Sequence, residues 1–392
     1  MSEFAVKMGN GTIAVDDTLL VKDVPATAGS RILEGFTPLF SAEVVERLQN
    51  KGYEMAGKTH VGEFGLDLVG EFSYYAPAQG TLKGAAATAV ANGTVKAALG
   101  VDMNGATRRA AALAGVDFLK PTYGTVSRYG VISCAASGEQ VGVYAGNAKD
   151  VSEIMSVIAG HDEKDGTSLK AESYDYTLCD VKGKKVGLVK SLLEKADDQT
   201  KAKVAAYADA LKAQGVEVEE IDCDLFALAN TAWQILMCAE TCNNVSRYDG
   251  VKYGHRAETY KNIDELYVNT RTEGFNFLTK AVILYGSDVL SKTRYKDCYD
   301  KSLRVRRVVY DAMAKLFETY DALLTPACGK ASFEQYEIKD AFAKVMEQSE
   351  FTAVANLIGI PAMVSGGVQL LGKHFDDATL LSLANAVEGM GE

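Results

Sequence analysis

KVGLVKSLLEKADDQTKAKVAAYADALKAQGVEVEEI, residues 185–221, decides the fold class because a strand, a helix and a second strand follow one another in it. VGLV at 186–189 is typical of a buried strand. Apolar side chains then recur at helical spacing, at Val204, Tyr207, Ala208 and Leu211. Gly215 ends that helix, and Val216 and Val218 alternate as the next strand. The segment predicts an α/β fold with a parallel or mixed sheet covered by helices.

A second helix-to-strand unit is expected at residues 41–55. Ser41 is predicted to cap a helix that ends at Gly52, and Tyr53 and Met55 begin an extended run. The apolar face of this helix comprises Val44, Val45 and Leu48. The chain has only 6 prolines and no Gly/Ser-rich linker, so residues 1–392 are expected to form one domain.

Composition excludes several classes of function. The formal net charge of −11 argues against direct binding of nucleic acid, which depends on a positive surface. The chain has neither a secretion signal nor an apolar run of membrane-spanning length, which predicts a cytoplasmic protein without membrane contact. The 7 cysteines are scattered and expected to be reduced, and the 4 histidines lack the spacing of a metal site. We therefore expect no metal.

Two unusual segments each leave two interpretations open. Residues 84–105, GAAATAVANGTVKAALGVDMNG, are small enough to form a tightly packed helix followed by a turn, or a loop whose backbone approaches a ligand. The basic cluster of Arg304, Arg306 and Arg307 fits a solvated helix face better than a phosphate-binding patch.

Several motifs resemble the amidase signature family, and within it the A subunits of glutamyl-tRNA(Gln)/aspartyl-tRNA(Asn) amidotransferases. The matching segments are GSRIL (29–33), GKT (57–59), LKPTYGTVSRYGVI (119–132), IAGHDEKDGTS (158–168), SRYDGVKYG (246–254), TRTEGF (270–275), NLIGIPAM (356–363) and GKHFDDATLL (372–381). The resemblance covers nearly the whole chain. It implies a mixed β-sheet enclosed by α-helices and no organic cofactor or metal.

The resemblance also implies a catalytic lysine, a relay serine and a nucleophilic serine, because a serine hydroxyl needs a base to attack an amide. Asp16 stands at the lysine position, Leu82 at the relay position and Ala106 at the nucleophile position. Two nearby residues could stand in for triad members. Lys22 could replace the lysine only if the register of the match were shifted, which breaks the GSRIL match, and Thr107, beside Ala106, could replace the nucleophile. We therefore expect a shortened member that lacks the triad.

Other departures fall around the expected pocket. The segments between Thr59 and Leu82 and between Met363 and Gly367 are shorter than in the family, as is the N-terminal part. The clamps for the charged ends of glutamine correspond to Ser349 and Val282, neither of which carries a charge. The vestigial pocket is expected to contain Asp102, Asn104, Gly105, Thr107, Arg108, Gln140, Val282 and Ser349.

Two functions follow from these observations. The first is a catalytically inactive amidase-like protein that acts through protein–protein interaction or assembly. Its expected partner is another copy of itself, a catalytic amidase homologue, or a B- or C-like amidotransferase subunit. The alternative is a residual or altered amidase that uses Lys22, Thr107 or Asp16. Asp16 would then form an acid/base site with Asp17; otherwise it pairs with Lys83 or faces water.

Overall fold

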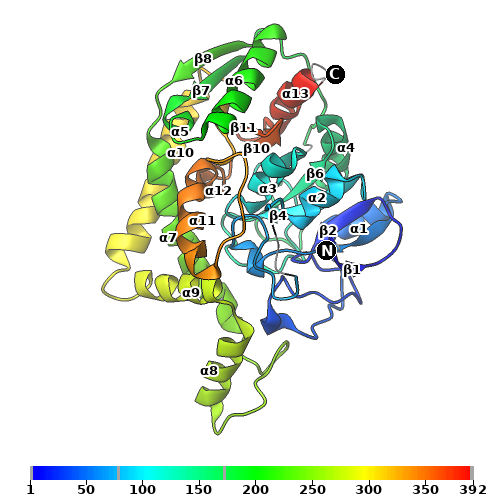
Figure 1. The fold of residues 1–392 in the computed structure, drawn as a ribbon, viewed down its shortest axis with the longest axis vertical. Coiled ribbons are helices and arrows are strands. Elements are labelled where there is room, and N and C mark those ends of the chain that lie inside the picture. The colour runs from blue at the N-terminus through cyan, green and yellow to red at the C-terminus, as the bar shows by residue number, and fades with distance from the viewer. Residues whose placement is uncertain (1–2, 77–79, 171–173, 389–392) are drawn as a thin grey trace.

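One mixed β-sheet runs through the computed structural model, which describes residues 3–76, 80–170 and 174–388 (Figure 1). Within these ranges the sheet has 11 strands in the order β1-β3-β2-β4-β6-β5-β10-β11-β9-β7-β8. The strands are β1 (Phe4–Lys7), β2 (Ile13–Asp16), β3 (Met55–Thr59), β4 (Ala97–Asp102), β5 (Asp117–Lys120), β6 (Gln140–Ala145), β7 (Lys185–Val189), β8 (Glu217–Ile221), β9 (Ala322–Pro326), β10 (Ala362–Ser365) and β11 (Val368–Gly372). Pairs β2/β3, β2/β4, β7/β8 and β7/β9 are parallel, whereas β4/β6, β5/β6, β10/β5, β10/β11 and β11/β9 are antiparallel. The predicted fold class is confirmed.

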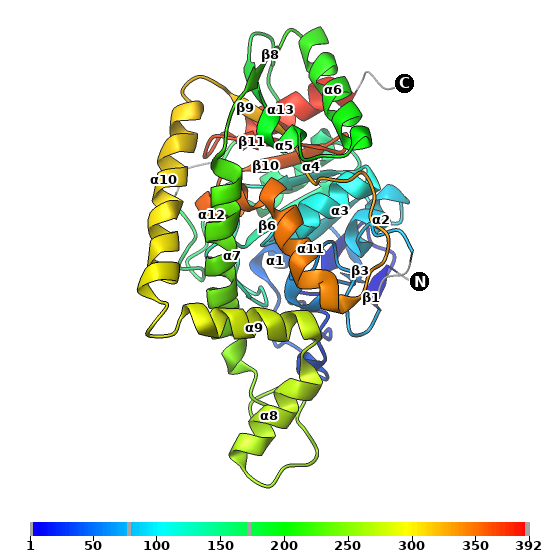
Figure 2. The ribbon, with the colours of Figure 1, turned by 60° about the vertical axis from the view of Figure 1, so that its left-hand side comes forward.

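Helices cover both faces of the sheet (Figure 2). They are α1 (Glu43–Asn50), α2 (Ala85–Ala91), α3 (Ala106–Ala114), α4 (Ala148–Ile158), α5 (Lys190–Leu193), α6 (Asp198–Ala213), α7 (Leu225–Asn244), α8 (Ile263–Gly274), α9 (Phe277–Val289), α10 (Lys301–Leu316), α11 (Ala341–Gln348), α12 (Ala353–Ile358) and α13 (Asp377–Glu388). Successive strand residues alternate between the faces: Leu370 belongs to the apolar cluster that includes residues of α1, α4, α6 and α13, and Leu371 to the cluster that includes residues of α7 and α12. None of the helices in the described ranges is long and apolar enough to cross a membrane.

The unit predicted at residues 185–221 forms as expected. β7, α6 and β8 follow in order, and β7 and β8 pair in parallel. The side chain of Asp197 caps α6 by accepting a hydrogen bond from the Thr200 backbone N–H. After the helix, Gly215 adopts a φ of 80°, the left-handed conformation that glycine tolerates best.

The unit at residues 41–55 forms with one correction. Helix α1 begins after Ala42, and the Ser41 hydroxyl accepts a hydrogen bond from the Lys22 backbone N–H at 3.0 Å instead of capping the helix. Ser41 thus binds the loop that contains Lys22. The prediction that it caps α1 is wrong, because a tertiary contact replaces the local one.

Residues 84–105 contain helix α2 and also strand β4, which the helix-and-turn interpretation missed. The small residues allow close packing: a Cβ at Gly100 would lie 2.8 Å from the Tyr144 ring. Gly84 and Met103 of the same stretch also line a cavity. The segment therefore combines features of both interpretations.

Helix α8 and its flanking loops, residues 246–276, form an arm that projects from the body (Figures 1 and 2). The arm is seated on the GSRIL segment, since the His255 N–H donates to the Ile32 carbonyl at 2.9 Å. A Cβ at Gly274 would lie 2.4 Å from the Ile32 side chain. Buried Glu63 also binds the arm, accepting hydrogen bonds from the Ser30 hydroxyl at 2.5 Å and the Asn276 N–H at 2.9 Å.

The attachment of the arm through Glu63 predicts a pH dependence of stability. Burial raises the pKa of Glu63 from 4.5 to about 7. Because the folded pKa exceeds the unfolded one, the folded state holds a proton that the unfolded state has lost, and stability falls as pH rises from about 4.5 to about 7. Glutamine has the shape of glutamate but does not titrate. In Glu63→Gln the decrease in the free energy of unfolding over this pH range should therefore be smaller than in the wild type by about 3 kcal/mol. Urea unfolding at pH 5 and pH 8 measures this free energy.

Glu220→Gln, the same substitution at an exposed position of β8, serves as the control and should retain the wild-type pH dependence. An unchanged pH dependence in Glu63→Gln would show that this carboxyl group titrates normally.

Candidate functional site

The turn between β4 and α3 is organised by a buried ion pair. The Arg108 guanidinium donates from Nε and Nη2 to the two oxygens of Asp102, both at 3.0 Å, and both side chains are fully buried. Thr107 Oγ1 and Asn356 Nδ2 also donate to Asp102, at 2.5 and 2.7 Å. Burial alone would raise the pKa of Asp102, but the charge of Arg108 and these hydrogen bonds hold it well below its usual range.

Arg108 also fastens the turn to distant parts of the chain. Its Nη1 donates to the Thr352 carbonyl at 2.9 Å and to Gln369 Oε1 at 2.8 Å. Gly105, which precedes α3, has a φ of 81°, and a Cβ there would lie 2.3 Å from the Thr352 side chain. The turn is thus locked between α12 and β11, with Ala106 as the first residue of α3.

Asp16 ends β2 beside this turn. Its Oδ1 accepts the backbone N–H of Thr18 at 2.9 Å and the Thr18 hydroxyl, and its Oδ2 accepts the Val101 N–H at 2.7 Å. Burial raises the pKa of Asp16 despite these bonds. The interpretation that Asp16 pairs with Lys83 or faces water is wrong, because the backbone of β4 and Thr18 take both oxygens.

Asp17, the neighbouring carboxylate, has a separate role. It pairs with buried Lys58 at 2.8 Å and accepts the Thr27 N–H at 2.9 Å. The two aspartates therefore face different partners, and nothing in their bonding joins them into one acid/base site. Sequence reasoning missed this ion pair, although a lysine inside the GKT strand, flanked by small residues, was an available signal.

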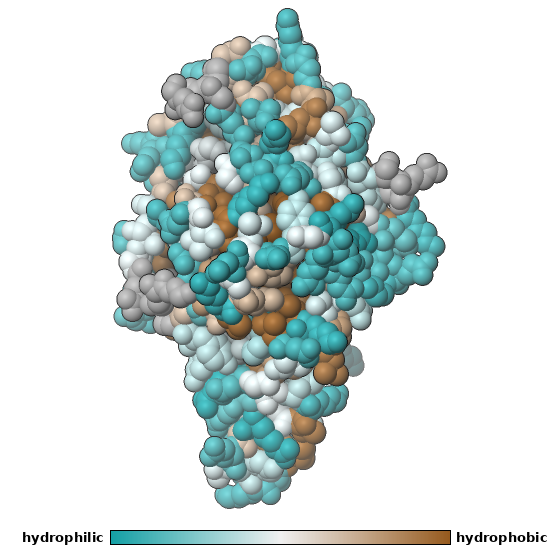
Figure 3. All heavy atoms as spheres, turned by 90° about the vertical axis from the view of Figure 1, so that its right-hand side faces the viewer, coloured by the Kyte–Doolittle hydropathy of each residue, from teal (hydrophilic) through white to brown (hydrophobic). Residues whose placement is uncertain are grey.

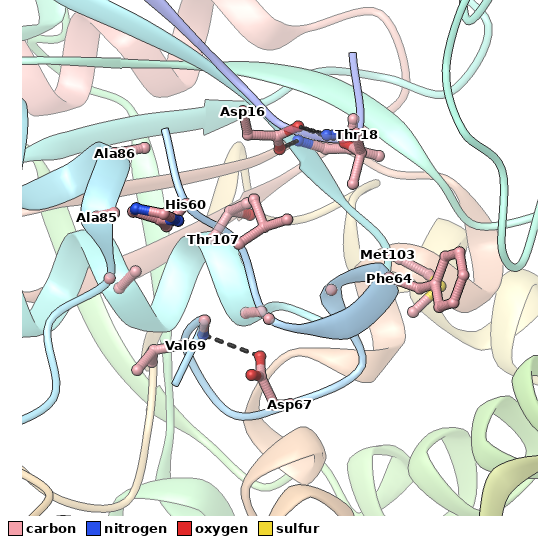
Figure 4. A pocket seen from close by; sticks show the side chains of 18 of the residues that line it. Asp16, Thr18, His60, Phe64, Asp67, Val69, Ala85, Ala86, Met103 and Thr107 are labelled. Atoms are coloured by element: carbon pink, nitrogen blue, oxygen red, sulfur yellow. Dashed lines mark hydrogen bonds between the residues drawn. The ribbon is translucent and has the colours of Figure 1, made fainter. Parts of the chain in front are cut away.

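A cavity of about 50 Å³ lies where β2, β4 and α3 meet. Figure 4 shows Asp16 and Thr18 at one edge of this cavity and Asp67 at the opposite edge, with His60 and Thr107 between them. The Ala106 methyl group also lines it. This volume holds a few water molecules at most, whereas ligand pockets commonly measure about 300 Å³ or more.

The ionisable residues on the cavity wall are engaged elsewhere. Asp67 accepts the N–H groups of Gly70 and Phe72 at 2.9 and 2.7 Å, and burial together with nearby Glu71 raises its pKa well above normal. Glu139 accepts the Ala135 N–H at 2.7 Å and also has a raised pKa because it is buried.

Burial lowers the pKa of His60, which keeps its ring neutral at pH 7. No group of three His, Cys, Asp or Glu residues in the described ranges could hold a metal ion.

The structure brings only some of the expected residues to this cavity. Asp16, Ala106 and Thr107 line it, while Leu82 does not. Leu82 is 1% exposed and packs in the apolar cluster beneath α2 and α3, with its N–H donating to the Phe333 carbonyl at 2.9 Å. Lys22 is exposed on the surface.

The other expected pocket residues are buried away from the cavity wall. They are Asp102, Asn104, Gly105, Arg108, Gln140, Val282 and Ser349. Gln140 is committed to backbone, accepting from the Gly124 N–H and donating to the Val126 carbonyl, both at 3.0 Å. Val282 of α9 packs in a buried apolar cluster. The Ser349 hydroxyl has no hydrogen-bond partner within the described chain. These positions are therefore framework rather than pocket wall.

Comparison with known proteins shows similarity to amidases along most of the chain. The amidase family profile matches residues 12–381. The A subunit of the glutamyl-tRNA(Gln) amidotransferase from Sulfurihydrogenibium sp. (strain YO3AOP1) is 35% identical over 402 residues, covering 97% of this chain and 83% of that protein. The corresponding A subunit from Acidobacterium capsulatum is 36% identical over 406 residues, covering 98% and 85%. The crystal structure of the Thermotoga maritima A subunit matches with a TM-score of 0.81 and 27% identity, covering 98% of this chain and 85% of that one.

Proposed function

The chain belongs to the amidase family, and from that premise we propose that it is a catalytically inactive relative of the amidotransferase A subunits that acts through protein–protein interaction or assembly. One observation carries the proposal: the residue at the nucleophile position, Ala106, lines the cavity and has only a methyl group as its side chain. A methyl group cannot attack an amide carbonyl.

The side chains that could substitute for the triad are not placed to react. The hydroxyl of Thr107 donates a hydrogen bond to Asp102. The pKa of Asp102 lies well below normal, so this carboxylate is a weak base. Asp16 has both oxygens bound by backbone N–H groups, and Lys22 lies on the surface away from the cavity. An altered amidase built on these three residues has no support in their geometry.

The size of the cavity supports the same proposal. At about 50 Å³ it has no room for a glutamine molecule. Its wall carries carboxylates, and the two positions that correspond to the substrate clamps, Val282 and Ser349, are buried outside it without charge. The carboxylate of an amino acid would lose its hydration there beside these carboxylates, because no lysine or arginine of the described chain lines the cavity.

The surface supports interaction with another protein. Nine of the 20 exposed large hydrophobic side chains in the described residues lie between Val251 and Tyr285, in the arm and α9. Val268 of α8 is 62% exposed and Leu284 of α9 is 74% exposed. Figure 3 shows apolar surface along one edge of the arm. Exposed apolar surface of this kind marks protein interfaces, and the net charge of −11 argues against a nucleic acid.

The first test restores the triad. Wild-type protein should hydrolyse glutamine no faster than buffer, and Asp16→Lys, Leu82→Ser and Ala106→Ser together should not raise the rate measurably, because the cavity remains too small. Leu82→Ser should itself cost about 3 kcal/mol, since the side chain is buried. Ammonia release and urea unfolding measure the two effects, with Ala106→Ser alone as the folded control. Turnover by the triple variant comparable to that of an intact A subunit would contradict the proposal.

The second test concerns the arm. The double variant Val268→Asp and Leu284→Asp should lose at least tenfold of the partner captured from the native organism, because charges on an apolar interface oppose its desolvation. Val308→Asp on α10, where the valine is 57% exposed, is the matched control and should capture as much as the wild type. Quantitative mass spectrometry of the captured proteins gives the readout. Equal capture by the arm variant and the wild type would place the interface elsewhere.

A further inference from the structure

A second, larger hollow lies along α10, outside the cavity beside Ala106. It is a cavity of about 360 Å³ between Tyr310, Met313 and Phe317 on one side and His374 and Phe375 on the other. Buried Ile358 and Ile360 form its floor. We call this hollow the α10 groove; it shares no lining residue with the cavity beside Ala106.

The groove continues along the helix. A second cavity of about 310 Å³, lined by Leu303, Arg306 and Arg307, shares Tyr310 and Ile358 with the first. Residues 303, 306, 310, 313 and 317 recur at helical spacing on one face of α10, over about 20 Å at 1.5 Å per residue. Together the two cavities have the size of a pocket for a small organic molecule.

Aromatic side chains line the groove, and one of these residues, Phe375, has an unfavourable backbone conformation. The Tyr310 and His374 rings are 5.4 Å apart and the His374 and Phe375 rings 6.2 Å apart. Phe375 has a φ of 65°, which is costly for an aromatic residue, and its side chain remains 58% exposed. Such strain is concentrated at ligand-binding segments. The Phe375 N–H donates to Thr122 Oγ1 at 3.0 Å and the ring stacks on Tyr174 with centroids 6.4 Å apart, so these contacts hold Phe375 where it lines the groove.

The charged groups of the groove favour an anion. Lys373 lines the first cavity and Arg306 the second, and in the described residues neither side chain forms an ion pair or a hydrogen bond. Arg307 is paired with Asp311 at 2.9 Å. Glu318 contributes one carboxylate to the first cavity. Burial lowers the pKa of His374, whose Nε2 lies 2.9 Å from the Ile358 carbonyl, so its ring is neutral at pH 7. Unpaired cations beside aromatic rings suit a ligand that is planar and negatively charged.

We propose that the α10 groove binds a small aromatic carboxylate, with its ring against the Tyr310 and Phe375 side chains and its carboxylate at Lys373. Met313 and Ile358 contact the apolar body of this ligand. Arg306 extends the site for a longer ligand with a second anionic group. The proposal is independent of the catalytic state of the other cavity, so it would stand even if the chain proved to be an active amidase.

2-Naphthoate is the probe, and 2-naphthalenemethanol is the same ring system without the charge. Calorimetric titration and saturation-transfer NMR should show 2-naphthoate binding with a Kd of about 1 mM or tighter. The alcohol should bind at least fivefold more weakly. Equal binding of the two probes, or no saturable binding of 2-naphthoate up to tenfold above that concentration, would overturn the proposal.

Variants locate the site. Lys373→Glu and Tyr310→Ala change exposed side chains and should each weaken 2-naphthoate binding at least tenfold. Lys315→Glu, the same charge change at an exposed residue of α10 outside the groove, should leave it within twofold of the wild type. Phe375→Gly should raise Tm by relieving the positive φ and still abolish binding. Retention of wild-type affinity by Lys373→Glu and Phe375→Gly would exclude this groove as the binding site.

Discussion

The buried pair of Asp102 and Arg108 is the interaction on which the site depends. Burying two charges costs their hydration, and this cost is offset only when the charges are fully hydrogen-bonded. Here the Arg108 guanidinium donates two hydrogen bonds to the Asp102 carboxylate. It also joins α3 to α12 and β11. Removing one member of such a pair typically costs about 3 to 5 kcal/mol. The turn between β4 and α3 therefore depends on this pair for its conformation, whatever residue stands at position 106.

In our proposal, this constraint explains how a catalytic framework can persist without its chemistry. The residues that hold the turn, Asp102, Gly105, Arg108 and Asn356, fit one another, while the positions that the family resemblance assigns to the triad carry an acid, a buried leucine and an alanine. The cavity beside the turn measures about 50 Å³. The GSRIL segment still seats the projecting arm, whose surface is rich in exposed apolar side chains. In our proposal, the retained framework supports that arm as a surface for another protein.

Sequence reasoning predicted the fold where a local pattern and the tertiary structure agree. The strands and helix between residues 185 and 221 formed as expected because α6 buries one periodic apolar face and β7 is an apolar strand buried along most of its length, to which β8 pairs in parallel. Strand β4 was missed because its alanines and glycine are poor strand formers that fit only beneath α2 and α3. The bond of Asp16 to Val101, and the cavity wall formed by His60 and Asp67, were also missed, since they depend on contacts between segments distant in sequence.

Labelling with a serine-directed fluorophosphonate, followed by intact-mass spectrometry, shows whether this chain carries an activated hydroxyl group. This reagent reports an activated hydroxyl without any assumption about the natural substrate. Because Ala106 carries no hydroxyl and the Thr107 hydroxyl is bound to Asp102, the account predicts an unmodified protein mass after prolonged exposure, while an intact A subunit treated in parallel is labelled. A stoichiometric adduct on any serine, or on Thr107, would show that the chain retains a working nucleophile.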